Sequence, residues 1–247
     1  WYKNCRQLIE VQLTLCHALE RSVQKNNYED WKRGDYVNKK NKVLILAPHT
    51  DDGEFACGGS VARFIEEGKD VYYAAFSTAE ESVPEPWPKD ILKTEVREAT
   101  KRLGIPRENL LIFNFKVREL SYHRQEILEE LVKMRKDIEP DMVFLPSSSD
   151  VHQDHSTISI EGLRAFKNTS ILGYEIPWNN IEFKAEAFVL LSEENINTKL
   201  HSLDAYNSQK GRNYANEEFI RSLARTRGVQ IGSRYAEAFE VIRWVMR

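Results

Sequence analysis

The chain has 247 residues, of which 41% are hydrophobic and 30% charged, a balance typical of a globular protein. A formal net charge of −3 gives no reason to expect nucleic acid as a partner. The three cysteines, Cys5, Cys16 and Cys57, lack the spacing of a disulfide framework. Such sparse cysteine usage favours a reducing compartment, and we predict a cytoplasmic protein.

The start of the chain is expected to form a helix and a linker. No apolar run approaches the roughly 20 residues that span a bilayer, and no secretion signal is visible. Helical spacing of apolar residues predicts a helix over 5–25, followed by a polar stretch over 24–42. The apolar face of that helix is a candidate docking surface in a homo-oligomer. We therefore divide the chain into residues 1–41, the helix and linker, and a second domain over 42–247.

From residue 43 onwards, short apolar runs alternate with amphipathic stretches. Strands are predicted over 43–48, 70–77, 109–115 and 141–146, with helices over 60–68, 89–104 and 124–140 between them. The later pattern predicts helices near 157–166, 193–206 and 216–226, and strands near 171–176, 187–191 and 236–246. Four strands separated by three helices indicate βαβ units. The predicted fold class is α/β, a Rossmann-like three-layer α/β/α arrangement around a mostly parallel sheet.

The stretch VLILAPHTDDGEFACGGS, residues 43–60, places His49, Asp51 and Asp52 at the exit of the first strand. Adjacent carboxylates repel one another and resist desolvation, so a compensating metal cation is expected beside them. The glycine pair in CGGS is typical of either a phosphate-cradling turn or close packing of a helix start on the sheet. Of these two, close packing is the favoured interpretation.

A second polar stretch, SSSDVHQDHST, follows the fourth strand as the first motif follows the first strand. It carries Asp150, His152, Asp154 and His155. In a doubly wound sheet of order 3-2-1-4-5, strands one and four are neighbours, and ligands bind in the crevice at their carboxyl ends. We therefore expect the two motifs to meet in one cleft.

Together the motifs have the residue types of a catalytic zinc site. Such a site uses three protein ligands from His and carboxylate side chains and leaves one position for water. A carboxylate beside the metal can then act as general base. Two adjacent Asp residues point in different directions, so one can bind the metal while the other faces the water.

PHTDDGEFACGG together with HQDH strongly resembles the LmbE-like, or PIG-L, family of metal-dependent N-deacetylases, over roughly residues 42–190. The resemblance implies hydrolysis of the acetamide of an N-acetylglucosamine-type sugar on a lipid, conjugate or nucleotide. It implies that His49, Asp52 and His155 bind Zn²⁺, with Fe²⁺ as the alternative. In this chain Gly53 stands where the family usually has Glu.

The resemblance also implies the remaining roles. Asp51 matches the general base, which activates water and later passes a proton to the leaving amine. His152 matches the residue that polarises the scissile carbonyl, and Asp154 is expected to orient His152. Arg118 loosely matches an arginine that contacts substrate in relatives. Candidates for a sugar pocket in the less regular half of the chain are Trp178, Asn179, Asn180 and Arg212.

Two other functions stay open from the sequence. One is hydrolysis of a different small amide, such as an N-formyl or N-acyl amine. The other is a sugar- or nucleotide-binding relative that kept the fold without the chemistry. The intact Asp51 favours an enzyme, because a binding module has no need of a base.

Overall fold

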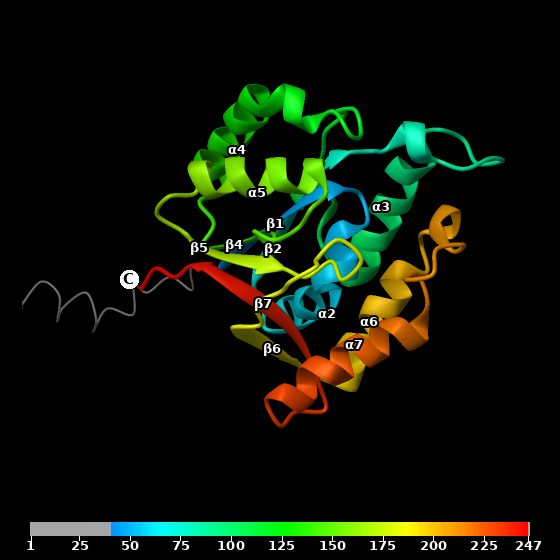
Figure 1. Ribbon diagram of the computed structural model, residues 1–247, viewed down its shortest axis with the longest axis vertical. Helices are drawn as coiled ribbons and strands as arrows, with labels where there is room; N and C mark the ends of the chain where they lie inside the picture. The colour runs from blue at the N-terminus through cyan, green and yellow to red at the C-terminus, as the bar shows by residue number, and fades with distance from the viewer. Residues whose placement is uncertain (1–40, 247) are drawn as a thin grey trace, which may run out of the picture. The chain divides into compact units, whose positions relative to one another are not determined.

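A seven-stranded sheet of order β3-β2-β1-β4-β5-β7-β6 forms the centre of the computed structural model, which describes residues 41–246 (Figure 1). The strands are β1 (Lys42–His49), β2 (Asp70–Ser77), β3 (Leu110–Ile112), β4 (Met142–Pro146), β5 (Ser170–Tyr174), β6 (Ala187–Leu191) and β7 (Tyr235–Arg243). The first five pair in parallel, whereas β7 is antiparallel to both β5 and β6. The predicted α/β fold is confirmed; the helix expected over 5–25 and the linker after it lie outside the described residues.

Helices cover both faces of this sheet (Figure 1). They are α2 (Asp52–Glu66), α3 (Ile91–Leu103), α4 (Arg124–Ile138), α5 (Gln153–Ala165), α6 (Glu193–Leu203) and α7 (Glu217–Gln230), with 3-10 turns η1 (Glu80–Ser82), η2 (Arg107–Asn109), η3 (Leu120–His123) and η4 (Asn207–Gln209). Along β1, Leu44 and Leu46 pack with α4 and α5, while Val43 and Ile45 pack with α2 and α3. Within the described region, no helix has the length and apolarity to cross a membrane.

Helix α2 begins at Asp52, directly after β1, and not near residue 60 as the sequence predicts. The chain kinks at Cys57, where φ is −136° and ψ is 20°, and then continues as helix. Inside this helix, a Cβ on Gly59 would lie 2.6 Å from Cδ1 of Leu191. The favoured interpretation of CGGS, close packing, is therefore right in kind, but the glycine lies within the helix and packs against β6.

A buried ion pair satisfies the backbone groups that the kink releases. The Glu237 carboxylate accepts from the backbone N–H groups of Gly59 and Ser60, at 3.0 and 2.7 Å. Lys199 Nζ donates to the carbonyl of Phe55 at 2.7 Å and to Glu237 at 2.6 Å. Because α6 and β7 supply these two side chains, the C-terminal elements fix the path of α2 below the site.

Two other elements differ in length from the sequence prediction. Strand β3 spans only three residues. After Ile112 the chain still runs beside β2, but only two isolated hydrogen bonds join them, from Phe113 N to the Ala75 carbonyl and from Phe115 N to the Phe76 carbonyl. Helix α5 begins at Gln153 and not at 157. Its start lies inside the second motif because the ring of His152 serves as the helix cap.

Candidate metal centre and active site

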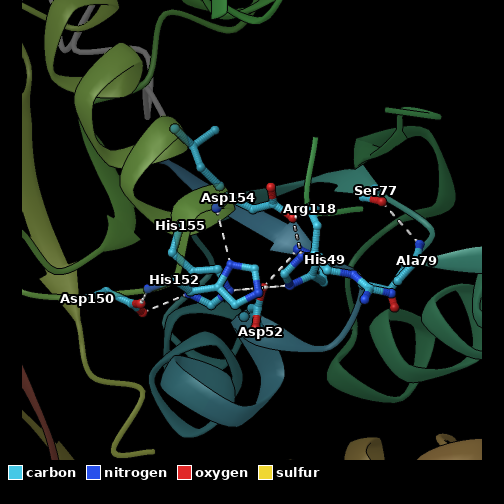
Figure 2. Close-up of polar contacts among 12 residues, drawn as sticks. His49, Asp52, Ser77, Ala79, Arg118, Asp150, His152, Asp154 and His155 are labelled. Atoms are coloured by element: carbon cyan, nitrogen blue, oxygen red, sulfur yellow. Dashed lines mark hydrogen bonds and ion pairs between the residues drawn. The ribbon is translucent and has the colours of Figure 1, made fainter. Parts of the chain in front are cut away.

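The two motifs meet at the carboxyl ends of β1 and β4, which are parallel neighbours. His49 ends β1 and Asp52 opens α2, whereas His152 caps α5 and His155 lies in its first turn. Figure 2 shows the three imidazole rings converging beside Asp52. The cleft expected between the two motifs is therefore present, at the point where the strand order changes direction.

Three ligand atoms form a small triangle in this cleft. Asp52 Oδ2 lies 3.2 Å from His49 Nδ1 and 3.2 Å from His155 Nε2. The two ring nitrogens are 3.3 Å apart. Tetrahedral zinc ligands with bond lengths of roughly 2.0–2.1 Å lie about 3.4 Å from one another. The side chains of His49, Asp52 and His155 therefore fit a single zinc-sized cation without rearrangement.

Each histidine of this triangle has a carboxylate behind it. His49 Nε2 lies 2.9 Å from Asp154 Oδ2, and His155 Nδ1 lies 2.7 Å from Asp150 Oδ2. A carboxylate holds the N–H proton on the outer ring nitrogen, so the inner nitrogen presents its lone pair to a cation. Asp150 is in the second motif, but sequence reasoning assigned it no role. Its position five residues before the candidate ligand His155 is the sequence feature that could have indicated this contact.

The expected pairing of the Asp154 carboxylate with His152 is wrong, because that carboxylate binds His49. The Asp154 backbone N–H does contact His152, donating to Nδ1 at 3.1 Å. At a helix N-terminus, the backbone N–H of the second residue after the cap points back at the capping side chain. The side chain of that second residue, here Asp154, points in a different direction. This bond requires an unprotonated Nδ1, so neutral His152 carries its proton on Nε2 as a hydrogen-bond donor.

The electrostatics of the cleft favour positive charge. Burial opposes the charged form of His49, but Asp52 and Asp154 raise its pKa to about 9. Burial likewise opposes charge on His155, yet Asp52 and Asp150 raise its pKa to about 10. Burial also opposes ionisation of Asp52, but His155 and His49 hold its pKa well below the usual range. A divalent cation would supply the positive charge that these carboxylates favour and displace the ring protons.

His152 is a poor candidate for a fourth ligand, although a nitrogen of each of His49, His152 and His155 lies within 4.8 Å of the others. Its Nδ1 accepts a hydrogen bond from the backbone N–H of Asp154, so the ring proton of the neutral imidazole lies on Nε2. Burial and the neighbouring His155 lower the pKa of His152, which keeps the ring neutral. The ring therefore offers a donor to the cleft rather than a lone pair to a metal.

Asp51 faces the same cavity, which has a volume of about 360 Å³. Burial and the adjacent Asp52 carboxylate raise the pKa of Asp51 to about 6. Such a carboxylate is ionised at neutral pH but accepts a proton more readily than an ordinary Asp. The same cavity is lined by the other candidate residues Arg118, Trp178 and Asn179, whereas Asp154 lies behind His49 and outside it.

The opposite wall of the cavity comes from the C-terminal part of the chain. The rings of Trp178 and Tyr214 stack with centroids 3.7 Å apart and planes 10° apart. The Phe55 ring makes T-shaped contacts with both rings, with its centroid 5.7 Å from that of Trp178 and 5.4 Å from that of Tyr214. Arg212 and Gln209 complete the wall. Sequence reasoning missed Phe55 because an apolar side chain inside the first motif is typical of the core. It missed Gln209 and Tyr214 because they lie in the turn η4 and a loop without a chemical motif.

The loop that carries Trp178 is held beside the second motif. Asp150 and Asn180 form an isolated antiparallel bridge, and Val151 N donates to the carbonyl of Asn179 at 3.3 Å. The Asn180 amide donates to Ser147 Oγ and accepts from a backbone N–H. Asn180, a candidate for the sugar pocket, is therefore a loop-to-loop tether that does not line the cavity.

The departure at Gly53 has a structural reason. A Cβ at this position would lie 2.5 Å from Cε2 of Tyr73, a fully buried ring. The hydroxyl of Tyr73 accepts from Gly53 N at 3.0 Å and contacts both the Thr50 carbonyl and the Glu54 carboxyl. Only glycine leaves room for this ring, which occupies the volume that a side chain at position 53 would need.

Glu54, one place later, is buried in the same network. Tyr206 Oη lies 3.0 Å from its Oε1 and 2.8 Å from the Thr50 carbonyl. Burial raises the pKa of Glu54 to about 8. The hydroxyls of Tyr73 and Tyr206 both contact the Thr50 carbonyl and the Glu54 carboxyl group. When Glu54 is neutral, its carboxyl O–H adds a third hydrogen-bond donor to this network. The network thus fixes the backbone on either side of Asp51 and Asp52.

Comparison with known proteins agrees with the motifs. Residues 44–166 match the sequence model of PIG-L, described as GlcNAc-PI de-N-acetylase. The chain is 28% identical to an uncharacterized deacetylase of Escherichia coli K12, YaiS, over 178 residues, or 70% of this chain and 94% of that protein. It is 25% identical to diacetylchitobiose deacetylase of Thermococcus kodakarensis over 238 residues, covering 86% and 87% of the two chains.

The fold likewise matches solved structures. A conserved protein from Thermus thermophilus superposes with a TM-score of 0.71 at 25% identity, and the match covers 83% of this chain and 96% of that one. The matched family region contains both motifs and every residue of the ligand triangle. Through residues 44–166, the chain belongs to the PIG-L family.

Proposed function

We propose that this protein is a metal-dependent hydrolase that removes the N-acetyl group from an N-acetylglucosamine-type amino sugar. The observation that carries the proposal is the ligand triangle of His49, Asp52 and His155 with Asp51 and His152 in the same cavity. The PIG-L match and the diacetylchitobiose deacetylase relative support the acetamide as the bond that is cleaved.

Each side chain has a defined task in this proposal. His49, Asp52 and His155 would hold Zn²⁺, or Fe²⁺, which supplies a Lewis acid and lowers the pKa of water. Asp51 takes a proton from the attacking water and gives it to the departing amine, so the products are acetate and a free amino sugar. His152 donates its Nε2 proton toward the developing oxyanion of the scissile carbonyl.

Asp154 and Asp150 position this machinery rather than contact substrate. Asp154 orients His49 with its carboxylate and His152 with its backbone N–H. Asp150 orients His155. Both histidine ligands and the donor therefore depend on one short loop and the first turn of α5, which fixes their relative geometry. A cytoplasmic location and a homo-oligomeric state stay predictions from the sequence.

An acetate-release assay on N-acetylglucosamine, diacetylchitobiose and N-acetylglucosamine-lipid conjugates tests the proposal, with metal content measured on the same samples. We expect about one metal per chain, and we expect Asp51→Asn to lower turnover by roughly 10²- to 10⁴-fold while metal stays bound. Asp90→Asn, an exposed site, is the matched control.

Three outcomes would contradict the proposal. Release of formate or a larger acid in place of acetate would favour the other small-amide hydrolase. Binding of sugars without any hydrolysis would favour the non-catalytic relative. Full activity in Asp51→Asn would remove this carboxylate from the reaction.

A further inference from the structure

Glu95 is a buried carboxylate that the proposed reaction does not use. It lies on α3, one helical turn after Leu92, which lines the cavity. Glu95 is only 4% exposed, and among the described residues no lysine, arginine or histidine nitrogen lies within 4.0 Å of its carboxylate. Burying a carboxylate without a cationic partner costs free energy. Its position therefore points to a task other than stability.

Both oxygens of this carboxylate bind one residue of η4. Glu95 Oε1 accepts from the backbone N–H of Ser208 at 2.9 Å, and Oε2 accepts from the Ser208 hydroxyl at 2.6 Å. Ser208 is itself buried, and η4 packs directly against α3. Hydrogen bonds to a carboxylate are stronger than those between neutral groups, so Glu95 holds η4 firmly on α3.

The hydrogen bonds continue from Ser208 to the wall of the cavity. Gln209 Nε2 donates to Ser208 Oγ at 3.1 Å, and Gln209 Oε1 accepts from Arg212 Nε at 3.3 Å. A carboxylate can only accept, so the Ser208 hydroxyl donates to Glu95 and is left to accept from Gln209. The carboxylate thereby fixes the orientation of the Gln209 amide, with the amide oxygen toward Arg212.

Gln209 lines the cavity with one N–H donor unused. Its amide nitrogen carries two N–H groups, and among the described residues only Ser208 accepts from either of them. The residue is 6% exposed, and Trp178 and Tyr214 line the same cavity. A largely buried donor needs an acceptor, and the hydroxyl oxygens of a sugar are suitable ones.

We propose that Gln209 binds the substrate and that Glu95 is the positioning residue that orients it. In the complex, the free N–H of Gln209 donates to a hydroxyl oxygen of the amino sugar. Glu95 contacts no substrate and acts through Ser208. This inference rests on the proposed deacetylation for the identity of the substrate, and it adds two residues that lie outside both motifs.

Glu95→Gln tests the orientation at constant side-chain size. The backbone N–H of Ser208 takes the one remaining oxygen, so the new NH2 group faces the Ser208 hydroxyl and reverses the order of donors and acceptors. We expect KM for the better substrate of N-acetylglucosamine and diacetylchitobiose to rise about 3- to 10-fold, with little change in kcat. Glu95→Asp keeps an acceptor-only group and should show a smaller rise. Glu108→Gln, an exposed site in η2, should leave KM unchanged.

A double variant separates positioning from a merely structural role. Gln209→Leu leaves the contact between Glu95 and Ser208 intact, and it should raise KM by about 3- to 10-fold through loss of the donor. In Glu95→Gln/Gln209→Leu, KM should rise no further than in Gln209→Leu alone, because Glu95 acts through this amide. Rises that multiply in the double variant would overturn the positioning role, and so would a fall in kcat at constant KM.

Binding of diacetylchitobiose to the Asp51→Asn protein, measured by calorimetry, gives a readout that needs no turnover. Adding Gln209→Leu or Glu95→Gln should weaken this binding about 3- to 10-fold. Unchanged affinity, or no binding of the sugar at all, would overturn this inference, whereas acetate release by the wild type would leave the deacetylase proposal standing. If the wild type releases no acetate from either compound, the deacetylase proposal fails, and the calorimetry alone decides whether Gln209 binds the sugar.

Discussion

The two walls of the cavity differ in how their side chains are held. On the wall formed by β1, α2 and α5, each ligand histidine has a carboxylate partner and is largely buried. On the wall formed by residues 178–214, Trp178 and Arg212 are exposed, and few of their polar groups are engaged. The side chains of the first wall are thus preorganised, whereas Trp178 and Arg212 on the second wall can be exchanged without removing a contact to the ligand histidines. We therefore expect substitutions on the first wall to change metal binding and turnover, and substitutions of these two side chains to change substrate selectivity.

The largest expected effect is on the ion pair that joins the two walls. Lys199→Met leaves the buried Glu237 carboxylate without its cation, and we expect a loss of about 3–5 kcal/mol in the free energy of unfolding. Urea denaturation measures it. Lys210→Met, at an exposed lysine, should be close to neutral. Unchanged stability in Lys199→Met would mean that the two walls fold independently of this pair.

The next effect is confined to the catalytic wall. Asp154→Asn removes the charge that holds the His49 proton, so metal affinity should fall by roughly 10- to 100-fold while the fold is retained. Titration against a competing chelator measures the affinity. Asp137→Asn, on the exposed face of α4, is the control. Equal metal affinity in both variants would show that the carboxylate behind His49 has no influence on the ligand.

A third change tests the packing beneath the metal ligands. Gly53→Ala places a methyl group against the buried Tyr73 ring, and we expect a loss of about 2 kcal/mol in stability. Gly211→Ala, where a Cβ meets no neighbour within 4 Å, should cost far less. In the double variant Gly53→Ala/Tyr73→Leu, the loss measured by thermal denaturation should be smaller than the sum of the two single losses, because the smaller side chain removes the clash. Additive losses in the double variant would mean that the clash is not the cause.

The smallest effect belongs to the second wall. Trp178→Leu removes the indole face and should raise KM roughly 3- to 10-fold with little change in kcat or metal content. Steady-state kinetics on the best acetylated substrate measures both constants. Trp244→Leu, beyond the end of β7 and away from the cavity, should leave KM unaltered. A fall in kcat with constant KM would place Trp178 on the catalytic side of the comparison.

Sequence reasoning reached the first wall and only part of the second. The parallel sheet follows from the hydrophobic runs, and the meeting of the two motifs follows once a doubly wound strand order is assumed. The choice of His49, Asp52 and His155 as ligands came from the family resemblance of the two motifs. The partner of the Asp154 carboxylate could not be predicted, because local spacing favours His152 while helix capping turns the side chain toward His49. Tyr214 was beyond reach for another reason: stacking on Trp178 depends on a loop whose path no periodicity encodes.

The kink in α2 has a consequence for the order in which the protein can mature. The backbone N–H groups of Gly59 and Ser60 find their acceptor on Glu237, which is synthesised 177 residues after Ser60. A nascent chain that already contains both motifs still lacks α6 and β7, so the carbonyl of Phe55 and the backbone N–H groups at the kink have no final partners at that stage. Long-range contacts of this kind form late, because loop closure must precede them. We therefore expect the support of the candidate metal centre, which is encoded far earlier in the chain, to be complete only after β7 has left the ribosome.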